Sequence, residues 1–282
     1  MIQEILQSKT DSAKKYALIT GASQGFGKEL AEELARRSHN LLLVSLPNEN
    51  LDKVSNELAS KYKIDVNYFE SDLTHERSVY DIAEWALSKY RVNVLINNAG
   101  IGGSMPFQLC TTKMLDEMIQ INIRAVTILT RLMIEELRSH PKSYILNVGS
   151  LASFSPMAFK TIYPASKAFI YSFSHGLNQE LKGSGVTVTA IHPGPMKTNA
   201  EVTSRIERQS PLGRLGLLSP KKVAKQAING LFKSRTQIVP GIYNRIFWLL
   251  MKITPLNFRL NLVSDVFKME ASKTHNGGKP FS

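Results

Sequence analysis

Short runs of apolar and β-branched residues alternate with amphipathic segments along most of the chain. One such segment, "FGKELAEELARRS" at residues 26–38, follows the first run, and "SVYDIAEWALSKY" at residues 78–90 precedes the fourth. Continuous apolar strands separated by helices are typical of a parallel sheet that helices cover on both faces. We therefore predict an α/β protein with a doubly wound parallel sheet of about seven strands. The expected strands lie at residues 16–20, 40–45, 66–71, 92–98, 143–150, 186–192 and 236–241.

The same pattern indicates a single domain with an appended C-terminal segment. No linker divides residues 1–241, and residues 242–282 follow as a basic, amphipathic helical extension. Residues 200–219 lack strand character. A long irregular connection inside a compact domain is often a lid or a binding loop, so we expect a substrate loop there. The closing stretch "SKTHNGGKPFS" has the composition of a disordered tail.

The composition excludes several classes of site. Cys110 is the single cysteine, so the chain forms no intramolecular disulfide and no cysteine-based zinc site. The histidines form no cluster with metal-ligand spacing, and we expect no metal. The N-terminus lacks a long apolar run before a small-residue cleavage site, and no stretch reaches the length of a membrane-spanning helix. These features together favour a cytoplasmic protein.

The positive charge of the chain is concentrated near its C-terminus. The formal net charge is +12, and residues 204–282 alone carry 14 basic and 3 acidic side chains. A basic segment of this kind suits an anionic membrane surface, an anionic substrate or nucleic acid. A solvated surface that keeps the protein soluble explains the charge equally well.

A glycine-rich turn, "TGASQGFG" at residues 20–27, joins the first expected strand to the first expected helix. Gly21 permits a tight turn, Gly25 lets the backbone approach a pyrophosphate, and Gly27 lets the helix pack close to the sheet. The amides at the helix N-terminus would then face phosphate. Any tight turn can use glycine, but this position predicts the dinucleotide site of a Rossmann fold.

Tyr163 and Lys167 stand four residues apart in "TIYPASKAF", a segment that suits a helix. At that spacing both side chains share one helix face. A cation beside a tyrosine stabilises the phenolate and lowers the pKa of the phenol, which suits acid–base chemistry. The spacing alone is equally compatible with an ordinary helix surface.

Three further motifs stand in order with the glycine turn and the tyrosine–lysine pair: "SDL" (71–73), "NNAG" (97–100) and "HPGPMKT" (192–198). With them, residues 14–241 resemble the stand-alone form of the short-chain dehydrogenase/reductase family. The resemblance implies that Asp72 meets adenine and that the last motif closes over nicotinamide. It assigns the following residues to the cofactor: Gly21, Ser23, Gln24, Gly25, Phe26, Gly27, Ser45, Asp72, Leu73, Asn98, Ala99, Gly100, Tyr163, Lys167, Pro193, Gly194 and Thr198.

The resemblance also implies a catalytic tetrad of Asn122, Ser150, Tyr163 and Lys167. Tyr163 would donate a proton to a ketone oxygen that Ser150 also hydrogen-bonds, while hydride arrives from the cofactor. Lys167 would lower the tyrosine pKa and bind the nicotinamide ribose, and Asn122 would hold a water that leads to solvent. We interpret His192 as a residue at the end of a strand and not as a base.

The choice of nicotinamide cofactor depends on the residues after the second strand. Members of the family that use NAD usually have an aspartate there, and members that use NADP usually have an arginine. Ser45, Leu46 and Pro47 fit neither pattern, and the missing acid removes the main barrier to NADP. Ser23 and Ser45 could bond a phosphate, and Lys28 or Lys53 could reach it, although Gln24 is uncharged. The sequence therefore favours NADPH over NAD.

The resemblance and the apolar, basic C-terminal segment together predict an NADPH-dependent reductase of an apolar ketone of the 3-oxoacyl type. The alternatives are an NAD-dependent, hydroxysteroid-like alcohol dehydrogenase and a non-catalytic NAD(P)-binding regulatory protein. We expect a homodimer or homotetramer that does not bind nucleic acid. The segment "IFWLLMKI" at residues 246–253, with its tryptophan and flanking cations, could contact a membrane peripherally or pack on the protein body.

Overall fold

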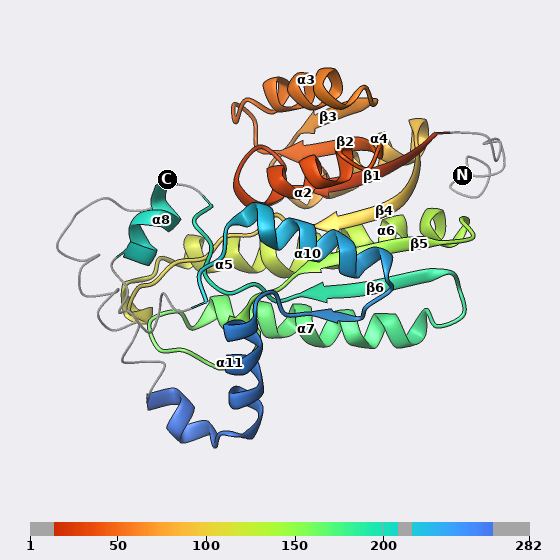
Figure 1. Ribbon diagram of the computed structural model, residues 1–282. Helices are drawn as coiled ribbons and strands as arrows, with labels where there is room; N and C mark the ends of the chain where they lie inside the picture. Colours follow the sequence, from red (N-terminus) through yellow and green to blue (C-terminus); the bar gives the residue numbers. More distant parts are fainter. Residues whose placement is uncertain (1–13, 199, 208–215, 262–282) are drawn as a thin grey trace.

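The computed structural model describes residues 14–198, 200–207 and 216–261. At its centre is one sheet of seven parallel strands in the order β3-β2-β1-β4-β5-β6-β7 (Figure 1). The doubly wound sheet that the sequence predicts is thereby confirmed. The strands are β1 (Lys15–Thr20), β2 (Asn40–Ser45), β3 (Val66–Glu70), β4 (Arg91–Asn97), β5 (Ser143–Val148), β6 (Val186–Ile191) and β7 (Gln237–Ile238).

Helices cover both faces of this sheet, because successive side chains of each strand enter different cores. Ala17 and Ile19 belong to one apolar core, whereas Leu18 belongs to the other. The first core is closed by α2 (Gly25–Ala35), α3 (Leu51–Tyr62) and α10 (Pro220–Phe232). The second is closed by α4 (Glu76–Lys89), α6 (Val126–Arg138) and α7 (Ile162–Glu180).

The strand order reverses at β1, which pairs with β2 on one side and β4 on the other. In open parallel sheets ligands bind beyond the carboxyl ends of the strands at such a point. The turn after β1 and the loops after β4, β5 and β6 therefore form the region in which a site is expected. The glycine turn, "NNAG", "HPGPMKT" and the tyrosine–lysine pair lie at these strand ends or in the helices that begin there, whereas "SDL" follows β3.

Part of the predicted irregular connection at 200–219 is a helix. Residues Ala200–Glu207 form α8, and Ile206 on it is buried. Figure 1 shows α8 on the side of the sheet toward which the strand arrows point. The prediction of irregular structure is wrong for this stretch, where Val202 and Ile206 stand four residues apart and so share one helix face. Residues 208–215 lie outside the described part of the chain, as does the predicted disordered tail.

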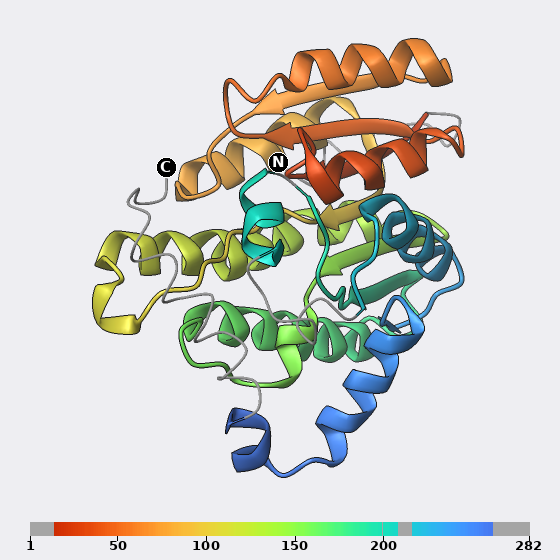
Figure 2. The same cartoon turned by 60° about the vertical axis from the view of Figure 1, so that its left-hand side comes forward.

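The C-terminal extension projects from the body as α11 (Ile242–Ile253), and residues 256–261 are also helical (Figure 2). The Trp248 and Phe154 rings lie 6.2 Å apart between centroids, and Arg259 Nη1 donates to the Phe154 carbonyl oxygen at 2.8 Å. These contacts fix α11 beside the short 3-10 turn Leu151–Phe154 that follows β5. No helix in the described ranges is both long and apolar enough to cross a membrane.

Candidate active site

A backbone cradle lies at the carboxyl end of β1, where three glycines turn the chain into α2. Gly21 and Gly25 have φ angles of 67° and 57°, a region that other residues rarely adopt. A Cβ on Gly27 would overlap the carbonyl oxygen of Gly21 and lie 2.5 Å from Asn98 Nδ2. The first amides of α2 also lack partners within the helix. A turn that is closed to side chains and rich in amides fits the pyrophosphate of a dinucleotide.

Residues of the "NNAG" motif, at the end of β4, hold this turn in place through hydrogen bonds. Asn98 Nδ2 donates to the carbonyl oxygens of Thr20 and Gly21, both at 3.0 Å. The backbone amides of Asn98 and Ala99 both donate to Thr20 Oγ1 at 3.1 Å. The side chain of Asn98 therefore shapes the cradle, and Gly100 follows as an exposed residue at the rim.

The "HPGPMKT" segment after β6 closes over the same turn. A Cβ on Gly25 would lie 3.0 Å from Thr198 Cβ, so the two motifs touch. The carbonyl oxygen of Pro193 accepts from the Leu151 amide at 2.9 Å, which ties this segment to the loop after β5. Two motifs more than 150 positions apart in sequence thus lie together at one edge of the sheet.

The buried side-chain amide of Asn244, on α11, packs against the start of the "HPGPMKT" segment. The sequence analysis did not single out this residue. Asn244 Nδ2 donates to the carbonyl oxygens of Gly216 and Pro240 at 3.0 and 2.8 Å. A Cβ on Gly194 would lie 2.5 Å from Asn244 Oδ1. Asn244 therefore packs against the closing segment, the chain before α10 and the end of β7. The sequence signal was slight, since a single asparagine in an apolar helix has many explanations.

The residues expected at the adenosine end lie at the carboxyl ends of β2 and β3, the two strands next to β1 in the sheet order. Asp72 follows β3, and its Oδ1 accepts from the Thr74 amide at 2.8 Å, while Leu73 is buried. Ser45 at the end of β2 is buried, and its hydroxyl donates to the Leu46 carbonyl oxygen at 3.2 Å. The Ser71 amide bonds the Ser45 carbonyl oxygen, which keeps the ends of β2 and β3 together.

Three further predicted cofactor residues have different surroundings within the glycine turn. Gln24 is exposed and precedes α2 without a side-chain bond to the helix. Phe26 is 6% exposed and belongs to the apolar core, so its backbone alone is available to a ligand. Ser23 is buried, and its hydroxyl donates to the carboxylate of Glu49.

Tyr163 and Lys167 lie side by side on the first turns of α7. Lys167 Nζ is 5.8 Å from the centroid of the Tyr163 ring and donates to the Val148 carbonyl oxygen at 2.9 Å. The lysine is only 5% exposed, and burial lowers its pKa to about 8 because the ammonium loses hydration. A cation in a site poor in water acts on a neighbouring phenol more strongly than one in solvent.

Asn122 is positioned by a π-helical turn, Gln120–Ala125, between α5 (Thr112–Ile119) and α6. Such turns are rare in helices and occur frequently at functional sites. The Asn122 side chain accepts from the Ile101 amide at 3.0 Å and donates to the Ile101 carbonyl oxygen at 2.9 Å. It also donates to Ser166 Oγ at 3.0 Å, and Ser166 bonds the Tyr163 carbonyl oxygen. The asparagine therefore joins the loop after β4 to the turn of α7 that carries the tyrosine.

Gly100 marks the point where this network meets the lysine. A Cβ on Gly100 would lie 3.1 Å from Asn122 Oδ1 and 3.3 Å from Lys167 Nζ. A Cβ on Gly102, two residues on, would lie 2.6 Å from Tyr163 Cδ2. The loop after β4 therefore runs directly over Asn122, Tyr163 and Lys167.

Ser150 follows β5 and begins the 3-10 turn Leu151–Phe154. Its Oγ accepts from the Ala152 amide at 3.1 Å, which occupies a lone pair but leaves the hydroxyl proton able to donate elsewhere. Ser153, within the same turn, donates to the Lys167 carbonyl oxygen at 2.8 Å. This bond holds the serine turn against α7. Ser153 and Ser166 are supporting residues that the sequence analysis did not identify.

His192 is fully buried and supports the serine turn from β6. Its Nδ1 lies 3.2 Å from the Ser150 carbonyl oxygen and 3.2 Å from Ser153 Oγ. Burial lowers the pKa of His192 to about 3, so the imidazole is neutral at physiological pH. This environment suits the strand-end interpretation of His192.

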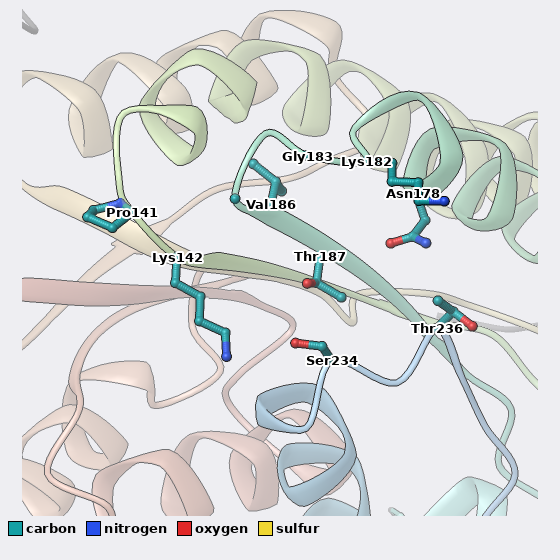
Figure 3. Close-up of a pocket in the computed structure, with 10 residues that line it drawn as sticks. Pro141, Lys142, Asn178, Lys182, Gly183, Val186, Thr187, Ser234 and Thr236 are labelled. Carbon is teal, nitrogen blue, oxygen red and sulfur yellow. The ribbon is translucent and has the colours of Figure 1, made fainter.

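A separate hollow lies at the opposite edge of the sheet, where β5 and β6 begin (Figure 3). Pro141 and Lys142 precede β5, Gly183 and Gly185 precede β6, and Ser234 follows α10. This is the amino edge of the parallel strands, where ligands of such sheets do not bind. The candidate site is therefore the carboxyl edge.

Comparison with known proteins agrees with this geometry. A family model for short chain dehydrogenases matches residues 15–209. A very-long-chain 3-oxoacyl-CoA reductase of Anas platyrhynchos is 34% identical over 200 residues, which are 70% of this chain. The chain spans 64% of the length of that relative.

Two solved structures resemble the whole arrangement. A short-chain dehydrogenase from Sphingobium yanoikuyae in complex with NADPH has a TM-score of 0.75 at 29% identity, covering 85% of this chain and 92% of the other. A 3-ketoacyl-(acyl-carrier-protein) reductase from Brucella melitensis complexed with NADH has a TM-score of 0.68 at 26% identity, covering 80% and 96%.

Proposed function

The chain belongs to the short-chain dehydrogenase family, and on that premise we propose that it is a nicotinamide-dependent oxidoreductase that reduces an apolar ketone of the 3-oxoacyl type. The observation that carries the proposal is Lys167, buried against Tyr163 beside a glycine cradle that fits a dinucleotide. The similarity to very-long-chain 3-oxoacyl-CoA reductases supports the substrate class.

The proposed roles of the side chains follow from their positions. A nicotinamide cofactor, when bound, supplies the hydride. Tyr163 donates its phenolic proton to the ketone oxygen, and Ser150 donates a hydrogen bond to the same oxygen as negative charge develops there. Lys167 stabilises the phenolate that remains. Asn122 acts on the tyrosine through Ser166 and holds the loop at Ile101 in place.

The substrate proposal is tested by assaying the purified full chain with 3-oxoacyl thioesters of short, medium and long chain. We expect kcat/KM to rise with length, by roughly three- to fourfold for each methylene that the site buries. A steroid ketone and a small aryl ketone serve as comparisons. Preferred turnover of the steroid would replace the proposal by the hydroxysteroid-like alternative. Nucleotide binding without turnover of any ketone would favour a regulatory protein.

We propose in addition that α11 contacts an anionic membrane surface. Five apolar residues occupy one face of the helix and are 46% to 79% exposed: Ile242, Ile246, Leu249, Leu250 and Ile253. Arg245 and Lys252 are exposed on the same helix, and the basic excess of the chain lies in this region. Apolar residues interspersed with cations suit the boundary between headgroups and hydrocarbon.

The membrane proposal predicts that the full chain sediments with vesicles that contain phosphatidylserine. Replacing Leu249 and Ile253 by glutamate should reduce the partition coefficient by at least about tenfold, because two apolar side chains no longer enter the interface. Replacing Tyr68 and Tyr80 by glutamate is the matched control, since both are exposed on other elements. Equal losses in the two double variants, or a wild type that stays in solution, would contradict membrane contact.

The oligomeric state, the cytoplasmic location and the substrate loop at 200–219 stay predictions. The position of α8 beyond the strand ends supports the last of them, since ligands of open parallel sheets bind on that side. We also propose that the dinucleotide-binding domain ends at residue 241 and that the C-terminal extension begins at residue 242.

A further inference from the structure

The loop after β2 brings a carboxylate to the cradle from a position that the sequence pattern does not indicate. Glu49 stands four residues beyond the end of β2 and accepts the hydrogen bond of Ser23. Ser23 is itself buried within the glycine turn. The carboxylate is thus held between the ends of β1 and β2.

The local backbone explains why Glu49 faces inward. Asn48 and Asn50, on either side of it, have φ angles of 65° and 57°. Asparagine tolerates this left-handed region better than other residues with a side chain. Two such residues turn the loop sharply between β2 and α3 and direct the intervening side chain back toward the glycine turn.

The Glu49 carboxylate lies near the end of the second strand and contacts the glycine turn, the region where doubly wound folds bind the adenosine ribose of a dinucleotide. In doubly wound folds the pyrophosphate lies at the start of the first helix, and an acid near the end of the second strand bonds the ribose 2′-hydroxyl. We propose that Glu49 supplies the acid that is missing at Ser45–Pro47, and that it selects an unphosphorylated ribose, NAD(H) over NADP(H). This inference rests on the proposed binding of a nicotinamide dinucleotide.

The neighbouring cations support the same selectivity. Lys28 Nζ pairs with a Glu57 carboxylate oxygen at 2.9 Å, and Lys53 Nζ donates to Asn50 Oδ1 at 2.7 Å. Both lysines that the sequence offers to a phosphate therefore have other partners. A 2′-phosphate would bring between one and two negative charges beside Glu49, whereas a 2′-hydroxyl can donate to it. The inference and the sequence-based preference for NADPH cannot both hold, and one measurement decides between them.

The test measures the affinities of two adenosine fragments by calorimetry, without any turnover. Adenosine 5′-monophosphate and adenosine 2′,5′-bisphosphate differ only in the 2′-phosphate. We expect the wild type to bind the monophosphate more tightly. Glu49→Gln keeps the size of the side chain and an acceptor for Ser23, and it should improve the relative affinity for the bisphosphate by at least about tenfold. NAD and NADP should show the same change.

Two further variants make the result specific. Glu49→Asp keeps the charge and should retain the preference for the monophosphate. Asp52→Asn removes an exposed carboxylate three residues away, in the first turn of α3, and should leave the ratio unchanged. A tighter wild-type complex with the bisphosphate, or an equal effect of Asp52→Asn, would overturn the role of Glu49 while leaving the proposed function in place. Failure of the wild type to bind NAD, NADP and both fragments would instead overturn the proposed function itself, and the inference with it.

Discussion

Replacing Tyr163 by phenylalanine should leave the fold and nucleotide affinity unchanged and slow ketone reduction by a factor on the order of 10²–10⁴. The variant keeps the ring beside Lys167 and removes only the hydroxyl group whose proton the developing alkoxide requires. The measurements are kcat for the preferred ketone, nucleotide affinity by calorimetry and the unfolding midpoint. A purified variant with a near-normal kcat would exclude Tyr163 as the general acid.

The pH dependence of reduction provides an internal control for this prediction. Burial lowers the pKa of Lys167 to about 8, so its positive charge is present below that pH and is lost as the pH rises through it. Wild-type reduction should therefore decline above about pH 8 as the electrostatic support of the phenolate disappears. In Tyr163→Phe the residual rate should lack this decline, because there is no phenolate for the ammonium to stabilise.

Replacing Gly27 by alanine should reduce kcat/KM for the cofactor by a factor on the order of 10², a loss that a shift of about 1 Å in a site can cause. The added Cβ overlaps the Gly21 carbonyl oxygen, and that overlap is relieved only if the backbone of the cradle moves. The strain should also lower the free energy of unfolding by about 1–3 kcal/mol, as overpacking does elsewhere. Steady-state kinetics at varied cofactor concentration and a denaturant melt measure the two effects.

Gly176→Ala is the matched control for the glycine turn. Gly176 lies within α7, and a Cβ placed there meets no atom within 4 Å among the described residues. The same chemical change should leave nucleotide binding intact and raise stability by roughly 0.5–1 kcal/mol, because alanine favours the helix. If Gly27→Ala behaved like Gly176→Ala, the cradle would tolerate a side chain and its fit to pyrophosphate would lose support.

The sheet could be predicted from sequence because most of its strands are apolar, β-branched runs that alternate with helical segments. The predicted strand ends are wrong where a strand stops because its backbone pairing stops, although its apolar composition continues. The stretch 236–241 reads as a strand, yet β7 pairs only at Gln237 and Ile238. Pro240 has no amide to donate, so the ladder cannot continue through it. Similarly, β5 ends at Val148, and the residues after it enter the serine turn.

The candidate site was predictable to the extent that its chemistry follows fixed spacings. The tyrosine–lysine pair, the glycine turn and the asparagine of "NNAG" all occupy the places that their motifs suggest. Glu49 was not predictable, because its direction depends on the backbone conformations of Asn48 and Asn50 and not on its distance from the strand. The supporting roles of Ser153 and Ser166 arise from contacts between distant elements, which no local pattern encodes.

Asn244 has an evolutionary consequence for the chain. Its amide fills space that a Cβ at either Gly194 or Gly216 would need, and it bonds the Gly216 carbonyl oxygen. A mutation to a larger residue at position 194 or 216 is therefore tolerable only after position 244 has become smaller, and a smaller residue at 244 leaves the buried Pro240 carbonyl oxygen without its donor. Substitutions at positions 194, 216 and 244 are therefore coupled to one another. The C-terminal extension is therefore not an independent module, because its first turn packs against the segment that closes over the glycine turn.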